Sequence, residues 1–184
     1  RRTRMIFRES ALAGVFLLEL ERREDERGFF ARTWARDELD GHGLSGHVEQ
    51  CNLAFNEHTG TLRGLHFQRA PHEDVKVVRC TAGSVYDVVV DARPDSPTYL
   101  HWLGVELSAL NGLALYIPAG CAHGYQTLTP DTETFYLHSA AYAPGFEGGL
   151  RWDDPALAID WPSVPRRIIS ERDRSWPEIG DASH

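Results

Sequence analysis

The chain has 184 residues with 27 acidic and 19 basic side chains, so its formal net charge at neutral pH is −8. This charge argues against a general binder of nucleic acids or anionic membranes, which attract positive surfaces, although a few local arginines can still hold a small phosphorylated ligand. No apolar run approaches the roughly 20 residues that cross a bilayer, and no long apolar segment follows the basic residues Arg1–Arg4, so we expect a cytoplasmic protein without a signal peptide.

The first predicted element is a short amphipathic helix at about residues 34–42, where Trp34 and Leu39 enclose charged residues and glycines follow. Runs rich in β-branched and aromatic residues predict four strands further along: Lys76–Cys80, Val85–Val90, Leu113–Ile117 and Thr134–His138. Turns are expected where Gly, Pro, Asn and Asp gather, at residues 56–60, 81–83, 93–97 and 118–120.

This pattern favours one all-β domain over residues 1–184. Many short strands at near-regular spacing are typical of a sandwich or barrel, and helix is scarce. The sequence contains no low-complexity linker and no fixed-period repeat. The tail holds Pro162, Pro165 and Pro177, so we expect residues 162–184 to form an extended strap that can include one short helix.

The three cysteines, Cys51, Cys80 and Cys121, are odd in number and widely spaced, without a Cys-x-x-Cys pair. This pattern predicts neither a disulfide framework nor a zinc knuckle. We expect three small buried residues in a reducing cytoplasm.

Two stretches have the spacing of the cupin motifs, which build a jelly-roll β-barrel. In the first, five residues separate Gly60 from His66, and Gln68, Lys76 and Gly83 follow. In the second, five residues separate Gly112 from Pro118, and Gly120 and His123 follow. The glycines and the proline supply turns between strands. Both motifs in the right order predict a cupin-type jelly roll with few short helices.

The cupin positions that usually bind a metal are altered in this chain. A metal cupin offers three histidines and one glutamate, whereas the sequence offers His66, Gln68, Lys76 and His123. Glutamine is a poor ligand for a transition metal and a protonated lysine repels the ion. We therefore expect no metal and no cofactor. A base, a cation and a second imidazole suit the removal of a proton next to a carbonyl, with stabilisation of the resulting enolate.

Each of these residues also has a structural interpretation. His66 and His123 can serve as hydrogen-bonding residues of a β protein, and Lys76 can lie on the surface, since its valine neighbours do not decide which face it uses. We assign no role to the remaining histidines, which mostly stand in loop-like context: His42, His47, His58, His72, His101, His138 and His184.

Further blocks extend the match over roughly Met5–Pro177. They are Asp25–Phe30, Gln50–Asn52, Leu62–Gln68, Lys76–Cys80, Ile117–Gly124, Phe135–Tyr136, Tyr142–Pro144, Asp160–Pro162 and Arg172–Asp173. At these residues the sequence resembles the dTDP-4-dehydrorhamnose 3,5-epimerase family, whose members act on a nucleotide-linked 4-keto sugar.

The resemblance implies a catalytic set of four residues. His66 matches the general base that removes a proton from carbon 5 or 3 of the hexose, and Asp173 matches the carboxylate that orients this imidazole. Tyr136 matches the acid that returns a proton from the opposite face. Lys76 matches the cation that stabilises the enolate.

It also implies substrate contacts and a homodimer with exchanged N-terminal strands. Arg63 and His123 match residues near the sugar and the pyrophosphate, and Arg27 and Phe30 match a nucleotide-contacting pair that a neighbouring subunit presents. Further matched contacts are Gln50, Asn52, Tyr142, Glu147 and Arg172. Arg32 stands where the family usually has a glutamate near the base, so thymidine is the default nucleotide while GDP- and CDP-linked sugars stay open.

Three classes of function remain open. The first is an epimerase acting at carbons 3 and 5, with a mono-epimerase or a ketoisomerase as close variants. The second is a sugar-nucleotide binder without catalysis, which would not need both a base and an opposing acid. The third is a metal-dependent cupin, against which Gln68 and Lys76 argue.

Overall fold

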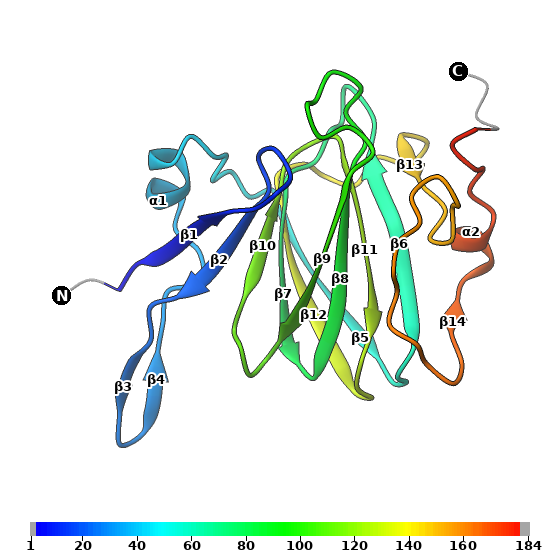
Figure 1. Cartoon of the computed structure of the whole chain (residues 1–184). Coiled ribbons are helices and arrows are strands. Elements are labelled where there is room, and N and C mark those ends of the chain that lie inside the picture. The colour runs from blue at the N-terminus through cyan, green and yellow to red at the C-terminus, as the bar shows by residue number, and fades with distance from the viewer. Residues whose placement is uncertain (1–2, 181–184) are drawn as a thin grey trace.

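The computed structural model describes residues 3–180, and residues 181–184 of the expected strap, with His184, lie outside them. Strands dominate the described chain (Figure 1). Its elements are β1 (Met5–Glu9), β2 (Phe16–Leu20), β3 (Arg23–Asp25), β4 (Gly28–Phe30), α1 (Arg36–Gly41), β5 (Gln50–Asn56), β6 (Thr61–Gln68), β7 (Lys76–Ala82), β8 (Ser84–Asp91), β9 (Trp102–Ser108), β10 (Ala114–Ile117), β11 (Cys121–Thr127), β12 (Thr132–His138), β13 (Glu147–Gly149), β14 (Ile168–Ile169) and α2 (Glu171–Arg174). No helix of this part of the chain is long and apolar enough to cross a membrane.

Two sheets face each other and enclose the core. One has the strand order β1-β2-β10-β7-β12-β5, and the other has the order β13-β6-β11-β8-β9, with β14 parallel to β6. Buried residues of both sheets, among them Val78, Leu115, Val85 and Val89, meet between them. The prediction of an all-β fold with few short helices is confirmed, and the two facing sheets agree with a cupin-type jelly roll.

The valine-rich run at Val85–Val90 is buried on both faces of its sheet. Val85 and Val89 belong to the core between the sheets. Val88 and Val90 pack on the outer face, under Leu157 and Trp161 of the C-terminal part. A strand that is buried on both faces has few positions to expose to solvent, which explains the valine-rich run.

The predicted elements lie close to the observed ones. Lys76–Cys80, Val85–Val90 and Thr134–His138 fall inside β7, β8 and β12, and the helix expected at residues 34–42 is α1. The strand expected from Leu113 begins one residue later. The Leu113 N–H donates to the Asn111 side chain at 3.0 Å and is therefore occupied by the turn.

The expectation of three buried cysteines is wrong for Cys51. All three thiols are free, but Cys51 is exposed, because it alternates with Asn52 and so lies on the outer face of β5, like the exposed Leu53 and Phe55. Cys80 and Cys121 are buried, and burial raises the pKa of the Cys80 thiol to about 11 and that of Cys121 to about 12. The two buried thiols are therefore uncharged at neutral pH.

A close approach of β6 and β11 prepares the site. Gly64 has a φ of +123°, and a Cβ there would lie 2.5 Å from the Gly124 Cα atom, so both positions require glycine. The register of the two strands shifts between His123 and Tyr125. His66 and His123 are partners across the strand pair, next to this shift.

Two peripheral segments extend from the sheets (Figure 1). The C-terminal segment runs along β6 as β14 and then forms α2, which brings Asp173 to that strand. The β3–β4 hairpin projects away from the body of the molecule at the opposite side.

Candidate active site

A cavity of about 390 Å³ opens between the two sheets. All four residues of the predicted catalytic set line it: His66, Lys76, Tyr136 and Asp173. The predicted contacts Asn52, Arg63, His123 and Arg172 line it as well. The structure thus brings together side chains from β5, β6, β7, β11, β12 and α2.

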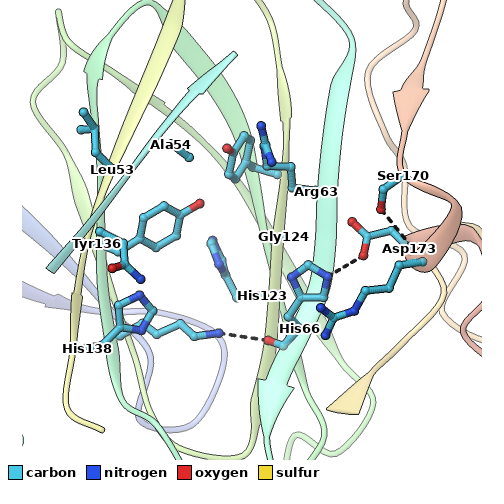
Figure 2. Close-up of a pocket in the computed structure, with 14 residues that line it drawn as sticks. Leu53, Ala54, Arg63, His66, His123, Gly124, Tyr136, His138, Ser170 and Asp173 are labelled. Atoms are coloured by element: carbon cyan, nitrogen blue, oxygen red, sulfur yellow. Dashed lines mark hydrogen bonds and ion pairs between the residues drawn. The ribbon is translucent and has the colours of Figure 1, made fainter. Parts of the chain in front are cut away.

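His66 and Asp173 form a dyad on one wall (Figure 2). The His66 Nε2 atom lies 2.6 Å from Asp173 Oδ1. Because an ionised carboxylate only accepts, Nε2 carries the proton and Nδ1 keeps the lone pair of a base. The His66 side chain is 39% exposed and that of Asp173 only 6%, so the imidazole is open to a ligand while its partner is shielded.

The Asp173 carboxylate is held in its ionised form. Its Oδ2 atom accepts the Gly64 N–H at 3.1 Å, and its own N–H donates to Ser170 Oγ at 3.2 Å. Burial alone would raise the pKa of Asp173, but the hydrogen bond and charge of His66 and the backbone donor at Gly64 outweigh it and lower the pKa.

Tyr136 stands on the opposite sheet, across the cavity from His66, with His123 between them (Figure 2). Its hydroxyl accepts one long hydrogen bond, from Thr134 Oγ1 at 3.4 Å. Burial, with the neighbouring Tyr125 hydroxyl, raises the pKa of Tyr136 well above its usual value. The phenol therefore remains protonated at neutral pH, as a proton donor must.

Lys76 points into the cavity rather than to the surface, which decides the question that its valine neighbours left open. The side chain is buried, and its Nζ donates to the His66 carbonyl oxygen at 3.1 Å. Burial lowers the pKa of Lys76, while the charges of Asp74 and Asp87 oppose this shift. An ammonium has three donors, so the others can bind a developing oxyanion.

His123 forms a second histidine–carboxylate pair, with Asp87. Its Nε2 lies 2.9 Å from both Asp87 oxygens, and the two side chains are almost fully buried. Burial raises the pKa of Asp87, against the opposing charges of His123 and Lys76. His123 lines the cavity between base and acid, and Asp87 holds its ring from behind.

Gln68, at a metal-ligand position of the cupin motif, supports a loop instead. Its Nε2 donates to the carbonyl oxygens of His72 at 2.8 Å and Ala141 at 3.2 Å, and its Oε1 accepts the Ala143 N–H at 2.8 Å. With this amide engaged and an ammonium at Lys76, the donor set does not fit a metal ion.

A second lobe of about 240 Å³ adjoins the first and shares His66, Lys76 and Arg172 with it. The predicted contacts Gln50, Tyr142 and Glu147 line this lobe. Three of its lining residues interact with one another: the Tyr142 hydroxyl donates to Glu147, and Arg172 lies 3.5 Å from the same carboxylate.

Comparison with known proteins assigns this arrangement to a family. The family model of the dTDP-4-dehydrorhamnose 3,5-epimerases matches residues 9–181. A protein of that description from Sinorhizobium fredii is 41% identical over 179 residues, which cover 95% of this chain and 90% of the relative. The chain belongs to the dTDP-4-dehydrorhamnose 3,5-epimerase family.

Solved structures of similar enzymes agree with this dTDP-4-dehydrorhamnose 3,5-epimerase fold. The crystal structure of the epimerase from Elizabethkingia anophelis superposes with a TM-score of 0.93 at 36% identity, covering 98% of this chain and 99% of that one. A 3'-monoepimerase from Streptomyces bikiniensis, solved in complex with dTDP-quinovose, superposes with a TM-score of 0.86 at 32% identity, covering 93% and 86%.

Three residues matched to the epimerase family lie away from the cavity. Arg27 and Phe30 stand on the β3–β4 hairpin, where Arg27 pairs with Asp25 at 2.6 Å and Phe30 is exposed. Arg32 lies beside α1, with its Nε 3.7 Å from Glu38 Oε1. Their roles as nucleotide contacts stay predictions, and those of Arg27 and Phe30 require a second subunit.

Sequence reasoning missed three residues of the site. Asp87 is the one charged residue in the run Val85–Val90, a signal that could have been used. His138, assigned no role, stands two positions after Tyr136 in the same strand and so on the same face. Its partner Asp74, at 2.6 Å, lies before β7 and gave no signal in the sequence.

Proposed function

We propose that this chain is a metal-independent epimerase that inverts carbons 3 and 5 of a nucleotide-linked 4-keto-6-deoxy hexose, of the dTDP-4-dehydro-6-deoxyglucose type. The observation that carries the proposal is the opposition of the His66–Asp173 dyad and Tyr136 across one cavity. Inversion needs a base on one face of the carbon and an acid on the other, and this arrangement supplies both.

The mechanism follows from the geometry. His66 Nδ1 takes the proton from the carbon next to the carbonyl, and Asp173 stabilises the imidazolium that forms. The electron pair of the broken C–H bond moves to the carbonyl oxygen, where the Lys76 ammonium stabilises the enolate. Tyr136 then gives its proton to the opposite face of the carbon, and solvent restores the protonation of both side chains.

The charge distribution supports a diphosphate-linked substrate. Arg63 and Arg172 line the cavity together with Lys76, so three cations face a volume that suits a phosphorylated ligand. The Streptomyces bikiniensis relative was solved with a dTDP-sugar, which supports thymidine as the nucleotide. GDP- and CDP-linked sugars are the alternatives that Arg32 leaves open.

We further propose a homodimer with exchanged N-terminal strands, in which each subunit presents Arg27 and Phe30 to the neighbouring cavity. The support is the projecting β3–β4 hairpin, on which Phe29 and Phe30 are 53% and 69% exposed. Large exposed aromatic side chains on such a hairpin are typical of an interaction site.

Proton NMR with dTDP-4-keto-6-deoxyglucose in deuterated water tests the function. We expect the signals of both carbon-3 and carbon-5 protons to disappear as deuterium replaces them. The His66→Ala variant should lose this exchange and still bind the nucleotide, because the base acts on the transition state rather than on ground-state binding. Exchange that persists in this variant would remove His66 from the mechanism.

A mono-epimerase is the second candidate, because one similar solved structure is a 3'-monoepimerase. Exchange at only one of the two carbons would identify this activity. No exchange would call for the GDP- and CDP-linked keto sugars, and failure with these as well would favour a binder without catalysis.

Chelation tests the third class, a metal-dependent cupin. We expect EDTA to leave the exchange rate unchanged, because Gln68 is engaged by backbone groups and Lys76 repels a cation. Inhibition by EDTA that a single added divalent metal reverses would contradict this expectation.

A further inference from the structure

The cavity contains a third histidine–carboxylate pair, His138 with Asp74, which the mechanism above does not use. His138 belongs to both lobes of the cavity. Its Nδ1 donates to Asp74 Oδ2 at 2.6 Å, and the two side chains are only 14% and 4% exposed. A carboxylate buried at such a place is costly unless hydrogen-bond donors compensate it.

Asp74 is fixed by the strand that carries His138. Its Oδ1 atom accepts the N–H groups of Ser139 at 3.0 Å and Ala140 at 3.2 Å, directly after β12. The carboxylate thus has three donors, and the last of them is the His138 ring. The plane of this imidazole is consequently set by hydrogen bonds to a rigid part of the sheet.

The Tyr136 ring is placed by its two imidazole neighbours. The His138 ring stacks on it at 15° with centroids 5.7 Å apart, and the His123 ring meets it edge-on at 73° and 6.0 Å. Both are favourable aromatic geometries. The hydroxyl has a long contact with Thr134, at 3.4 Å, and the Tyr125 hydroxyl is its other polar neighbour. We therefore take the two rings as the main determinants of the orientation of the phenol.

We propose that His138, oriented by Asp74, is a positioning residue that holds the Tyr136 phenol in line for proton delivery. This inference rests on the proposed epimerase function. It assigns His138 no contact with the reacting carbon. Loss of the stacked ring leaves His66 able to remove protons, but it lets the phenol turn away from the face that must receive one.

The prediction is a change in the partition between exchange and inversion. In deuterated water, His138→Ala should keep carbon–hydrogen exchange within about twofold of wild type, while inversion falls about tenfold or more, since small misplacements of a reacting group carry penalties of this size. More of the deuterated sugar then keeps the starting configuration. Exchange is followed by NMR, and configuration is determined after borohydride reduction of the ketone.

The double variant His138→Phe with Asp74→Asn provides the rescue. It restores a flat ring against Tyr136 and leaves no unpaired buried carboxylate, so inversion should return to within about threefold of wild type if the stacked ring is what matters. His47→Ala is the matched control, because His47 is an exposed histidine 3.5 Å from a carboxylate, Glu49, away from the cavity.

The outcomes separate this inference from the proposed function. The positioning role of His138 is supported if the wild type shows both exchange and inversion, His138→Ala shifts the partition between them, and the double variant restores it. Proportional loss of exchange and inversion, or an unchanged partition, overturns it while the epimerase function stands. Absence of exchange in the wild type with each keto sugar overturns the proposed function itself.

Discussion

The three histidines of the cavity share one chemical arrangement but differ in access to solvent. Each has a carboxylate partner, yet the His66 side chain is 39% exposed, whereas His123 and His138 are 4% and 14% exposed. A base must reach its substrate, so the open pair is the one suited to proton removal. The closed pairs are suited to holding the acid, and the distinction comes from burial rather than from residue type.

Lys76 makes the pH dependence of the reaction testable. Burial lowers the pKa of its ammonium, so this group loses its proton below the usual lysine value of about 10.4. The pKa of Tyr136 is raised, so the phenol remains protonated across the same range. The exchange rate should therefore fall on the alkaline side because the cation that stabilises the enolate is lost.

Two variants assign this alkaline limb. Lys76→Met should lower exchange at neutral pH by about 10²-fold or more, as expected for loss of a charge that stabilises an oxyanion, and its residual rate should lack the limb. Tyr136→Phe should retain the limb while losing inversion. The measurement is the deuterium exchange rate against pH, and a limb that survives in Lys76→Met would assign it to another group.

Among the site residues, the sequence predicted those that lie at a motif spacing and did not predict those whose partners are distant in the chain. His66, Lys76 and His123 follow from the cupin intervals. Asp173 lies 107 positions from His66, and no local pattern connects two such segments, so only the family resemblance indicated it. Asp74 was invisible for the same reason, because its role exists only once β7 and β12 are paired.

At the scale of elements, the pairing of β6 with β11 determines where the dyad stands. The four strands that the sequence predicted correspond to β7, β8, β10 and β12, because their composition in β-branched and aromatic residues is local. The strap that supplies Asp173 was predictable only as a proline-rich tail, since its path depends on the parallel contact of β14 with β6. The close approach of β6 and β11 that this pairing requires depends on two single residues, Gly64 and Gly124.

Gly64→Ala tests this contact. The added Cβ would lie 2.5 Å from Gly124 Cα and 2.7 Å from the His123 carbonyl oxygen, at a φ of +123°. We expect a loss of about 2 kcal/mol in the free energy of unfolding, as for overpacking without room to relax. Urea denaturation measures it. Gly41→Ala is the control, since nothing lies within 4 Å of its added Cβ, and an equal effect of both would contradict the expectation.

At the scale of the whole molecule, the β3–β4 hairpin projects from the body of the chain and does not line its own cavity. Arg27 and Phe30 are exposed there, far from the cavity that contains His66. In a two-fold dimer each subunit presents the same surface to the other, so one hairpin can complete the neighbouring site. Residues of the two regions then act together although they belong to different chains.

Mixing inactive variants tests whether the hairpin acts across subunits. His66→Ala supplies an intact hairpin, and the double variant Arg27→Ala with Phe30→Ala supplies an intact dyad. Co-expression should restore about a quarter of the wild-type sites, because half of randomly assorted dimers are mixed and each mixed dimer has one complete site. Co-expression of His66→Ala with Asp173→Asn should restore none, since both changes damage the same wall of a cavity within one subunit. Equal rates in the two mixtures would mean that Arg27 and Phe30 serve their own chain, whereas an active hairpin variant would mean that they serve no site.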